Sequence, residues 1–548
     1  MKPVSLNANW QLFLDDHVVG RSTGFTRVLH APRSHGVVIP ADRPWETAGV
    51  ETLYGSGIGR SADGTFFAFY RAMWWDPQVA DQLPSGSRKD RAHHAQFTHA
   101  YATSEDGIHW NKPDLGLAPA PAGIDDSGPW PRPTGSTLQN NIGVPLADLV
   151  DLGQYGNVSH PERRFVLNVA PDAGKAASED AMAEVLSAWS PHFAAEVPDF
   201  VNDPHWRDKL TPIDGRLNPR RHYVDFWDPM HEEWVALDQG CGPGHWLPSR
   251  EIARFASRDF RTWRTEAVLY PDSEDSHTME CFDEPMTMHP FCAEGIVFGL
   301  LSWFHSDRTH PEGGPRSDLP TERVSPWSWY RKGTNDVRIT ISRDGGRTWD
   351  RTVSREAWIA HNPYPHADDA LPYRPTPPVR VGDEDWFYVT CMNGDHLVVR
   401  NSLEQNAYYH DRVVRMNILL YTQPHNRYVS MRSPTAAPQV LITRPMNIEG
   451  AALQLNADAS HGRIRLAIAP AQDQSVTMGD GTVAPALAPH LAEPFPGFSF
   501  DDCEPIHTNR IEQAVNFKDG KMPGELQGRP VFLLIEVSDA DIYGFRSV

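Results

Sequence analysis

The sequence lacks long hydrophobic runs, paired cysteines and an excess of positive charge. Each absence excludes certain classes of function. No apolar stretch among the 548 residues approaches the roughly 20 residues that a membrane-spanning helix needs. The segment from Met1 to Trp10 also lacks the apolar run of a secretory signal peptide. We therefore expect a cytoplasmic protein with no membrane contact, provided that this N-terminus was not trimmed.

Cysteine is scarce, and the motifs of several enzyme classes are missing. The five cysteines are odd in number and have no C-x-x-C spacing, which excludes a disulfide framework and a zinc ribbon. The spacing of His93, His94 and His99 matches neither an HExxH motif nor a paired zinc-finger pattern. Neither a dinucleotide- nor a phosphate-binding glycine loop is present, nor the Gly-x-Ser-x-Gly elbow of serine hydrolases. We therefore expect no metal and no cofactor.

Positive charge is in deficit, since 50 basic residues face 71 acidic ones and the formal net charge is −21. Nucleic-acid affinity rests on Lys and Arg that neutralise phosphates, so we expect no nucleic-acid partner. A polyanionic glycan is also disfavoured, although a local basic pocket could override the global field. An oligomer of this chain is among the assemblies that the sequence allows.

A short turn motif recurs along the chain. Tyr101–Trp110 consists of a strand, a polar turn and a closing tryptophan, and Ser257–Trp263 and Ser342–Trp349 are related. The last is the nearest to the Ser-x-Asp-x-Gly-x-x-Trp "Asp-box" of β-propeller blades. In such a turn the Ser and Asp side chains bond backbone N–H groups, and glycine accepts a positive φ. Asp106, Asp259 and Asp344 are therefore expected to be structural, and the repetition predicts repeated sheets.

Short strands broken by Gly, Asp and Pro fall into about five groups, which favours a propeller over a sandwich for most of the chain. The groups are expected around residues 54–104, 144–169, 221–257, 295–342 and 385–421. One helix is predicted within an insertion near 175–200, where Ser178 could cap the helix and Pro191 could stop it. After about residue 435 the strands alternate without Asp-boxes. We therefore predict an all-β chain, with a five-bladed β-propeller over 1–434 and a C-terminal β-sandwich over 435–548.

Several segments resemble bacterial proteins described as glycosyl hydrolase family 32-like or 43-like five-bladed propellers. The resemblance is carried by Leu12–Asp16, Arg27–His30, Pro44–Glu46 and Ser104–Pro113, and in the tail by Thr443–Pro445, Gly450–Asn456, Pro496–Ile506 and Ile542–Phe545. It implies the propeller and sandwich and an activity on glycosides. The Trp-Met-Asn-Asp-Pro-Asn motif of invertases is absent, so the resemblance assigns no catalytic residue.

Glycoside hydrolysis needs one protonated and one ionised carboxyl group, and a propeller gathers such groups from different blades at one end of its funnel. Acids close to the expected inner strands are therefore the catalytic candidates. Trp45 could raise the pKa of Glu46 by desolvation, as an acid catalyst requires. Each of these acids has surface solvation or strand capping as its ordinary alternative. The catalytic candidates are Asp15, Asp16, Glu46, Glu51, Asp225, Glu280, Asp283 and Glu284.

Substrate-binding candidates are aromatic, histidine and arginine side chains at expected strand ends. Flat rings stack on sugar C–H faces, and arginine forks bind hydroxyl or carboxylate groups, although packing between sheets and ion pairs between blades are the ordinary alternatives. The substrate-binding candidates are His30, Trp45, Trp74, Trp75, Arg250, Arg254, Trp303 and His305. Less favoured candidates for the same role are His35, His277, Trp327, Trp329 and Arg338.

These observations predict a glycoside hydrolase that cleaves an oligosaccharide with two carboxyl groups and no cofactor. A transglycosidase or a polysaccharide lyase on the same fold is the first alternative, and the lyase would need a Tyr or His base beside a cation. A non-catalytic carbohydrate- or protein-binding propeller is the second alternative.

Overall fold

The computed structural model describes most of the chain, and the described part contains strands, turns and short 3-10 helices but no α-helix. The described residues are 2–53, 57–75, 95–125, 127, 132–152, 161–171, 177–178, 188–217, 223–241, 250–275, 281–307, 333–361, 371–393, 416–471, 475–477, 483–485 and 493–548. The prediction of an all-β chain is confirmed for these residues. Within them, no helix has the length and apolarity that crossing a membrane requires.

The chain forms two compact units. The smaller comprises Met1–Ala31, Arg380–Asp385 and Gln423–Val548, and the larger comprises Pro32–Val379 and Trp386–Thr422. This division differs from the expected boundary at 434/435, which assigned the N-terminal residues to the propeller. The physical reason is strand pairing, because the N-terminal strands add to the sheets of the C-terminal segment.

The smaller unit contains two six-stranded sheets and one hairpin. The first sheet joins β1 (Val4–Leu6), β30 (Met446–Ile448), β36 (Pro530–Ser538), β29 (Gln439–Thr443), β3 (Val19–Arg21) and β32 (Arg463–Pro470). The second joins β35 (Asn509–Ala514), β31 (Leu453–Asp458), β37 (Ala540–Ser547), β28 (Val429–Ser433), β4 (Thr26–Leu29) and β2 (Gln11–Leu12). The remaining elements are the hairpin β33 (Ser475–Thr477) and β34 (Val483–Pro485), and the 3-10 helices η10 (Lys518–Gly520) and η11 (Pro523–Leu526).

One hydrophobic cluster fills the space between the two sheets of the smaller unit. Leu533 and Ile535 of β36 belong to the same buried cluster as Leu455 of β31 and Phe545 of β37. Burial of side chains from both inner faces is what holds two sheets together. The two sheets of the smaller unit therefore share one buried core, to which the N-terminal segment contributes Leu6, Phe13 and Val18.

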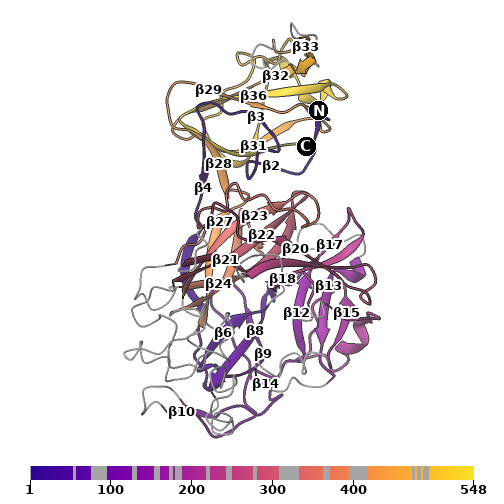
Figure 1. Cartoon of the computed structure of the whole chain (residues 1–548), viewed down its shortest axis with the longest axis vertical. Helices are drawn as coiled ribbons and strands as arrows, with labels where there is room; N and C mark the ends of the chain where they lie inside the picture. The colour runs from indigo at the N-terminus through magenta and orange to yellow at the C-terminus, as the bar shows by residue number, and fades with distance from the viewer. Residues whose placement is uncertain are drawn as a thin grey trace. The chain divides into compact units, whose positions relative to one another are not determined.

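The larger unit consists mostly of antiparallel sheets made from consecutive strands (Figure 1). Its separate sheets are β12 (Leu146–Asp151), β13 (Phe165–Val169), β15 (Ser190–Ala194) and β16 (Thr211–Pro212); β17 (Phe226–Asp228), β18 (Glu233–Cys241), β19 (Arg250–Ser257) and β20 (Arg264–Leu269); and β21 (Cys281–Ala293), β22 (Ile296–Asp307) and β23 (Gly333–Ser342).

A ten-stranded sheet contains both the first and the last strands of the larger unit. It joins β14 (Ala177–Ser178), β9 (Ala95–Ser104), β8 (Phe66–Trp75), β7 (Ile58–Arg60), β6 (Gly49–Thr52), β5 (Arg33–Ile39), β27 (Met416–Pro424), β26 (Glu384–Met392), β25 (Val379–Val381) and β24 (Leu371–Pro375). The other elements are the hairpin β10 (Gly123–Asp125) and β11 (Arg132–Thr134), and the 3-10 helices η1 (Pro44–Glu46), η3 (Pro161–Arg163) and η5 (Trp206–Lys209).

Successive sheets of the larger unit pack on one another. One hydrophobic cluster joins β8 to β12 and β13, a second joins β13 and β15 to β18, and a third joins β18 and β19 to β21 and β22. Trp358, which follows β23, packs edge-on against Phe387 of β26. Met416 of β27 then lies opposite Gly49 of β6. Packing and strand pairing thus connect neighbouring groups of strands within the larger unit.

The three Asp-box turns form as the sequence predicts. Ser342 Oγ accepts the N–H of Gly346 at 2.8 Å, and Asp344 Oδ1 accepts the N–H of Thr348 at 2.9 Å. The turns at Ser104 and Ser257 have the same kinds of bond. The aspartates at these turns are therefore structural.

The insertion near 175–200 differs from the expected helix at both of its ends. Ser178 lies in β14, which pairs with β9, instead of capping a helix. Pro191 lies in β15, which pairs with β13. The remainder of the predicted helix, 179–187, is outside the described residues.

Candidate functional site

The strongest candidate site is a row of three side chains across β21, β22 and β23. Asp283 lies directly opposite His305 in the strand register, and Asp336 lies two residues beyond the partner of His305 on β23. Nδ1 of His305 is 2.7 Å from Oδ1 of Asp283, and its Nε2 is 2.8 Å from Oδ2 of Asp336. One imidazole ring therefore bridges two carboxylates on neighbouring strands.

The charge of this ring follows from its partners. Burial disfavours the imidazolium, but the hydrogen bonds and charges of Asp283 and Asp336 outweigh it and raise the pKa of His305 to about 9. At neutral pH the ring is thus a cation that donates both bonds. Burial would raise the pKa of Asp336, yet hydrogen bonds from His305 and Arg338 lower it.

Asp336 is held in place by Arg338 as well. The guanidinium donates from Nε to Oδ1 of Asp336 at 2.9 Å and from Nη2 to Oδ2 at 3.3 Å, while Nη1 donates to the carbonyl of Ser354. Forked arginine–carboxylate pairs fix orientation as well as charge. Asp336 therefore serves as the fixed end of the row.

Asp283 is the open end of the row. Its side chain is 26% exposed, against 8% for Asp336. Oδ1 is bonded to His305, and Oδ2 has no hydrogen-bond partner among the described residues. An oriented carboxylate with one exposed oxygen is suited to contact a substrate.

Arg250 and Glu284 form a second pair beside this row. Nη1 of Arg250 is 2.7 Å from Oε1 of Glu284, and its backbone N–H donates to Oε2 at 2.8 Å. The guanidinium also lies over the ring of Phe304 at 4.9 Å. Glu284 is 2% exposed and both its oxygens are occupied, so its observed role is to join β19 to β21.

Glu46 occupies a closed cage. Its carboxylate accepts hydrogen bonds from Lys112 Nζ at 2.6 Å, from Tyr70 Oη at 2.9 Å and from the backbone N–H groups of Asp42 and Arg43. Burial raises the pKa of Glu46, although Lys112 and Tyr70 oppose this. The expected rise is present, but a side chain with no exposed surface offers no face to a substrate.

Glu51 is also fully buried. Its carboxylate lies 2.9 Å from Nη1 of Arg71 and 2.8 Å from Nη1 of Arg374. Asp225 remains partly exposed and accepts the backbone N–H of Leu237 through Oδ2 at 2.6 Å. Of these two candidates, only Asp225 keeps a surface that a ligand could reach. Glu280 lies outside the described residues.

Three candidates belong to the smaller unit instead of the propeller segment. Asp15 is buried and accepts the backbone N–H of His17. Asp16 is 76% exposed and pairs with Arg27. His30 bonds Ser430, and burial lowers its pKa. The expected domain division assigned all three residues to the propeller segment 1–434, whereas they belong to the smaller unit because N-terminal strands pair within its sheets.

The other expected binding residues are mostly internal. Trp45 is 7% exposed and donates to Oδ1 of Asn141, Trp74 is 6% exposed, and Trp303 is fully buried. Arg254 is buried and bonds Glu233. In the described structure none of these four forms a sugar-stacking rim. The side chain of Trp75 lies outside the described residues, as do His277, Trp327 and Trp329.

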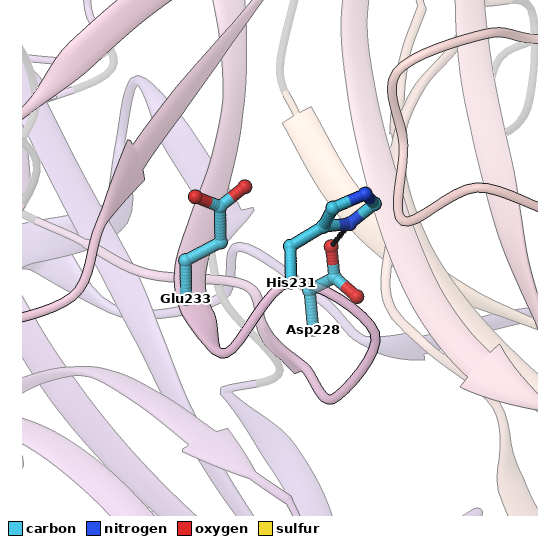
Figure 2. A group of neighbouring side chains, drawn as sticks. All are labelled: Asp228, His231 and Glu233. Carbon is cyan, nitrogen blue, oxygen red and sulfur yellow. Dashed lines mark hydrogen bonds and ion pairs between the residues drawn. The ribbon is translucent and has the colours of Figure 1, made fainter.

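A possible set of metal ligands is formed by Asp228, His231 and Glu233, which Figure 2 shows around the turn before β18. His231 Nδ1 is 2.7 Å from Asp228 Oδ2. Arg254 binds both carboxylates. Two more arginines, Arg264 and Arg347, bind Glu233. Three guanidinium groups compensate the two carboxylates, so the cluster is an ion-pair network and its donor set does not suit a cation.

Sequence reasoning missed several residues that organise these sites, namely Asp336, Arg71, Arg374 and Lys112. The signal for Asp336 was present in the alternation Thr334-Asn335-Asp336-Val337-Arg338, which places Asp336 and Arg338 on one face of a strand. The side-chain partners of Glu46 and Glu51 come from other segments and leave no local pattern.

Comparisons with known proteins give distant structural likenesses only. No sequence profile of a known family matches the chain, and no curated protein matches it. Similar solved structures include a glycoside hydrolase at 14% identity, covering 72% of this chain and 93% of that one with a TM-score of 0.34. A GH32 β-fructofuranosidase from Bombyx mori has 11% identity, coverage of 96% and 95%, and a TM-score of 0.28.

A third similar structure is a β-1,2-mannobiose phosphorylase from Listeria innocua, at 8% identity, with coverage of 76% and 96% and a TM-score of 0.32. TM-scores this low carry no argument about function. The proposed function therefore rests on the chain's own residues.

Proposed function

We propose that the protein is a glycoside hydrolase that cleaves an oligosaccharide, with Asp283 as a working carboxylate. The observation that carries the proposal is the row at the ends of β21–β23, in which a charged imidazole orients a carboxylate that keeps one exposed oxygen. Glycosidic bonds are cleaved by carboxyl groups of this kind.

The proposed scaffold is a closed five-bladed propeller. The five groups would be β6–β9, β12–β16, β17–β20, β21–β23 and β24–β27. Their support is the succession of hydrophobic contacts between groups and the shared sheet of the first and last. A ring would place the ends of β21–β23 at the mouth of its funnel.

The proposed role of Asp283 is that of nucleophile or base. The hydrogen bond with His305 fixes the orientation of the Asp283 carboxylate, as a group that attacks a sugar or activates water requires. The proton donor must then be another carboxyl group. Asp225, which stays partly exposed on the neighbouring sheet, and Glu280, directly before β21, are the two proposed donors.

A lyase is less well supported. It would need a neutral His or Tyr base, and the pKa of about 9 keeps His305 protonated at neutral pH. A transglycosidase would use the same two carboxyl groups, so product analysis with water and with sugar acceptors separates it from a hydrolase.

A screen of aryl glycosides and short oligosaccharides tests the proposal. Asp283→Asn should lower kcat on a cleaved substrate by about 10³-fold, as expected for the loss of an essential acid–base or nucleophilic group. Asp225→Asn and Glu280→Gln should identify the proton donor. Asp344→Asn, at an Asp-box, is the matched control and should keep kcat within about twofold in folded protein.

Wild-type turnover in Asp283→Asn would overturn the assignment of the carboxylate. No product from any glycoside would overturn the hydrolase, and glycan binding by calorimetry in the same samples would then favour the non-catalytic alternative.

A further inference from the structure

The row of site residues continues into the protein interior. Behind Asp336 and its partner Arg338 lies the ring of Trp303, 4.9 Å from the guanidinium carbon of Arg338. The guanidinium carbon of Arg351 lies 4.4 Å from the centre of the same ring. Two arginines therefore contact one tryptophan.

This tryptophan is held by its contacts with the two cations and by packing. Trp303 is fully buried, and its indole nitrogen has no hydrogen-bond partner among the described residues. Cation–π contacts are worth about 0.5–1 kcal/mol at exposed sites and ~2 kcal/mol when desolvated, and both arginine side chains are under a tenth exposed. Loss of either cation removes one of the contacts that hold the ring in place, so the ring and the other arginine should shift.

Arg351 also binds an acidic turn. Its Nη1 and Nη2 donate to the two oxygens of Asp275 at 2.6 and 2.9 Å. The turn from Asp272 to Asp275 directly precedes the segment that leads to β21 and Asp283. A hydrogen bond from Arg355 to Asp272 lowers the pKa of that carboxyl.

Arg355 binds the same turn. It donates to Asp272 at 2.7 Å and to Asp275 at 3.2 Å. The two arginines thus share the turn, whereas among the described residues the guanidinium groups that lie over the Trp303 ring are those of Arg338 and Arg351.

We propose that Arg351 is a positioning residue for the site, acting through Trp303, Arg338 and Asp336 on His305 and Asp283. The proposal rests on the proposed function insofar as it concerns turnover, but the link between Arg351 and His305 is independent of any activity. Loss of Arg351 would free Arg338 from the ring and weaken its fork on Asp336.

Matched variants separate the two contacts of Arg351, one with the ring of Trp303 and one with the turn Asp272–Asp275. Arg351→Met should lower kcat on a cleaved glycoside by about tenfold with little change in KM, because small displacements of a working group are costly. Arg355→Met, which disturbs only the turn, should stay within about twofold. The double variant Arg351→Met with Arg338→Met should lose no more than the worse single variant, since both act along one path.

The titration of His305, followed by NMR of its imidazole, provides the readout that needs no activity. Arg351→Met should move the midpoint upward, because a less neutralised Asp336 and the loss of a nearby cation both favour the imidazolium. Arg355→Met should leave the midpoint at its wild-type value. If the wild type cleaves nothing, the proposed function fails and this titration still decides the positioning role.

An unchanged His305 midpoint in Arg351→Met would overturn the proposal, as would equal losses of kcat in both single variants. If Arg351→Met does not fold, Arg351→Lys and Arg355→Lys replace the pair, and only the former should lower kcat. Equal behaviour of these two would also overturn the proposal.

Discussion

Oε1 of Glu51 lies 2.8 Å from Nη1 of Arg374, and this contact joins β6 of the first strand group to β24 of the last. The same carboxylate binds Arg71 of β8 at 2.9 Å. Glu51 and Arg374 are fully buried, and the neighbouring Thr52 donates to the carbonyl of Arg374. The ion pair lies where the first and last groups meet, so its effect is to hold these groups together.

Glu51→Gln should therefore destabilise the larger unit strongly. The amide removes the charged carboxylate that both guanidinium groups contact, and breaking a buried pair in this way costs about 3–5 kcal/mol. Urea unfolding followed by tryptophan fluorescence measures the change.

The control is Glu162→Gln, at an exposed pair with Arg163 whose nitrogen and oxygen are 3.9 Å apart. It should change the unfolding free energy by about 0.5 kcal/mol or less. A loss in Glu51→Gln as small as the loss in the control would show that this pair does not secure the meeting of the two groups.

The free energy of unfolding should fall as the pH rises from about 6.5 to about 9. The pKa of His305 is raised from its ordinary 6.5 to about 9 in the folded protein, so its stabilisation is complete below 6.5 and is lost as the pH rises through 9. The full shift corresponds to at most about 3 kcal/mol. His305→Gln should flatten this part of the stability profile.

His99 contributes a pH dependence of the unfolding free energy with the opposite sign. Burial, with a contribution from Arg71, lowers its pKa to about 3, so its contribution is present above 6.5 and is lost as the pH falls. His99→Gln should leave the fall between pH 6.5 and 9 unchanged. An identical fall in His305→Gln and in the wild type would contradict the assignment to His305.

Glu46→Gln should lower the free energy of unfolding but should not lower kcat. The substitution leaves Lys112, whose side chain is 3% exposed, without its strongest partner, and we expect a loss of about 3 kcal/mol. In folded protein, kcat should remain within about twofold of the wild-type value. A loss of kcat similar to that of Asp283→Asn would show that Glu46 takes part in the reaction.

The strands and turns were predictable because their signals are local. The Asp-box at Ser342–Trp349 needs only nearby side-chain and backbone groups, so its sequence alone predicts the turn. The expected strands at 66–74 and 233–237 correspond to β8 and β18 for the same reason. Periodicity and turn residues decide such elements within a few positions.

The candidate site was predictable only in part. Asp283 and His305 were chosen separately by residue type and expected strand position, and their pairing depends on the register of two long strands. The environment of Glu46 was not predictable, because Lys112 and Tyr70 reach it from other segments. The N-terminal strands gave no sign of their partners, since pairing with residues more than 400 positions away leaves no local pattern.

Gly345→Ala tests whether the Asp-box of the β23 group fixes its contact with the preceding sheet. Gly345 has a φ of +72°, and a Cβ added there would lie 2.0 Å from Oδ2 of Asp228. The alanine must therefore displace a carboxylate that is bound to Arg254, in addition to adopting an unfavourable backbone conformation. We expect a loss of stability above the roughly 1–2 kcal/mol that a left-handed conformation alone costs. Gly36→Ala is the control, because Gly36 has a φ of +77° with nothing within 4 Å of the added atom. Equal losses in the two variants, measured by urea unfolding, would show that the turn can shift away from Asp228 without cost.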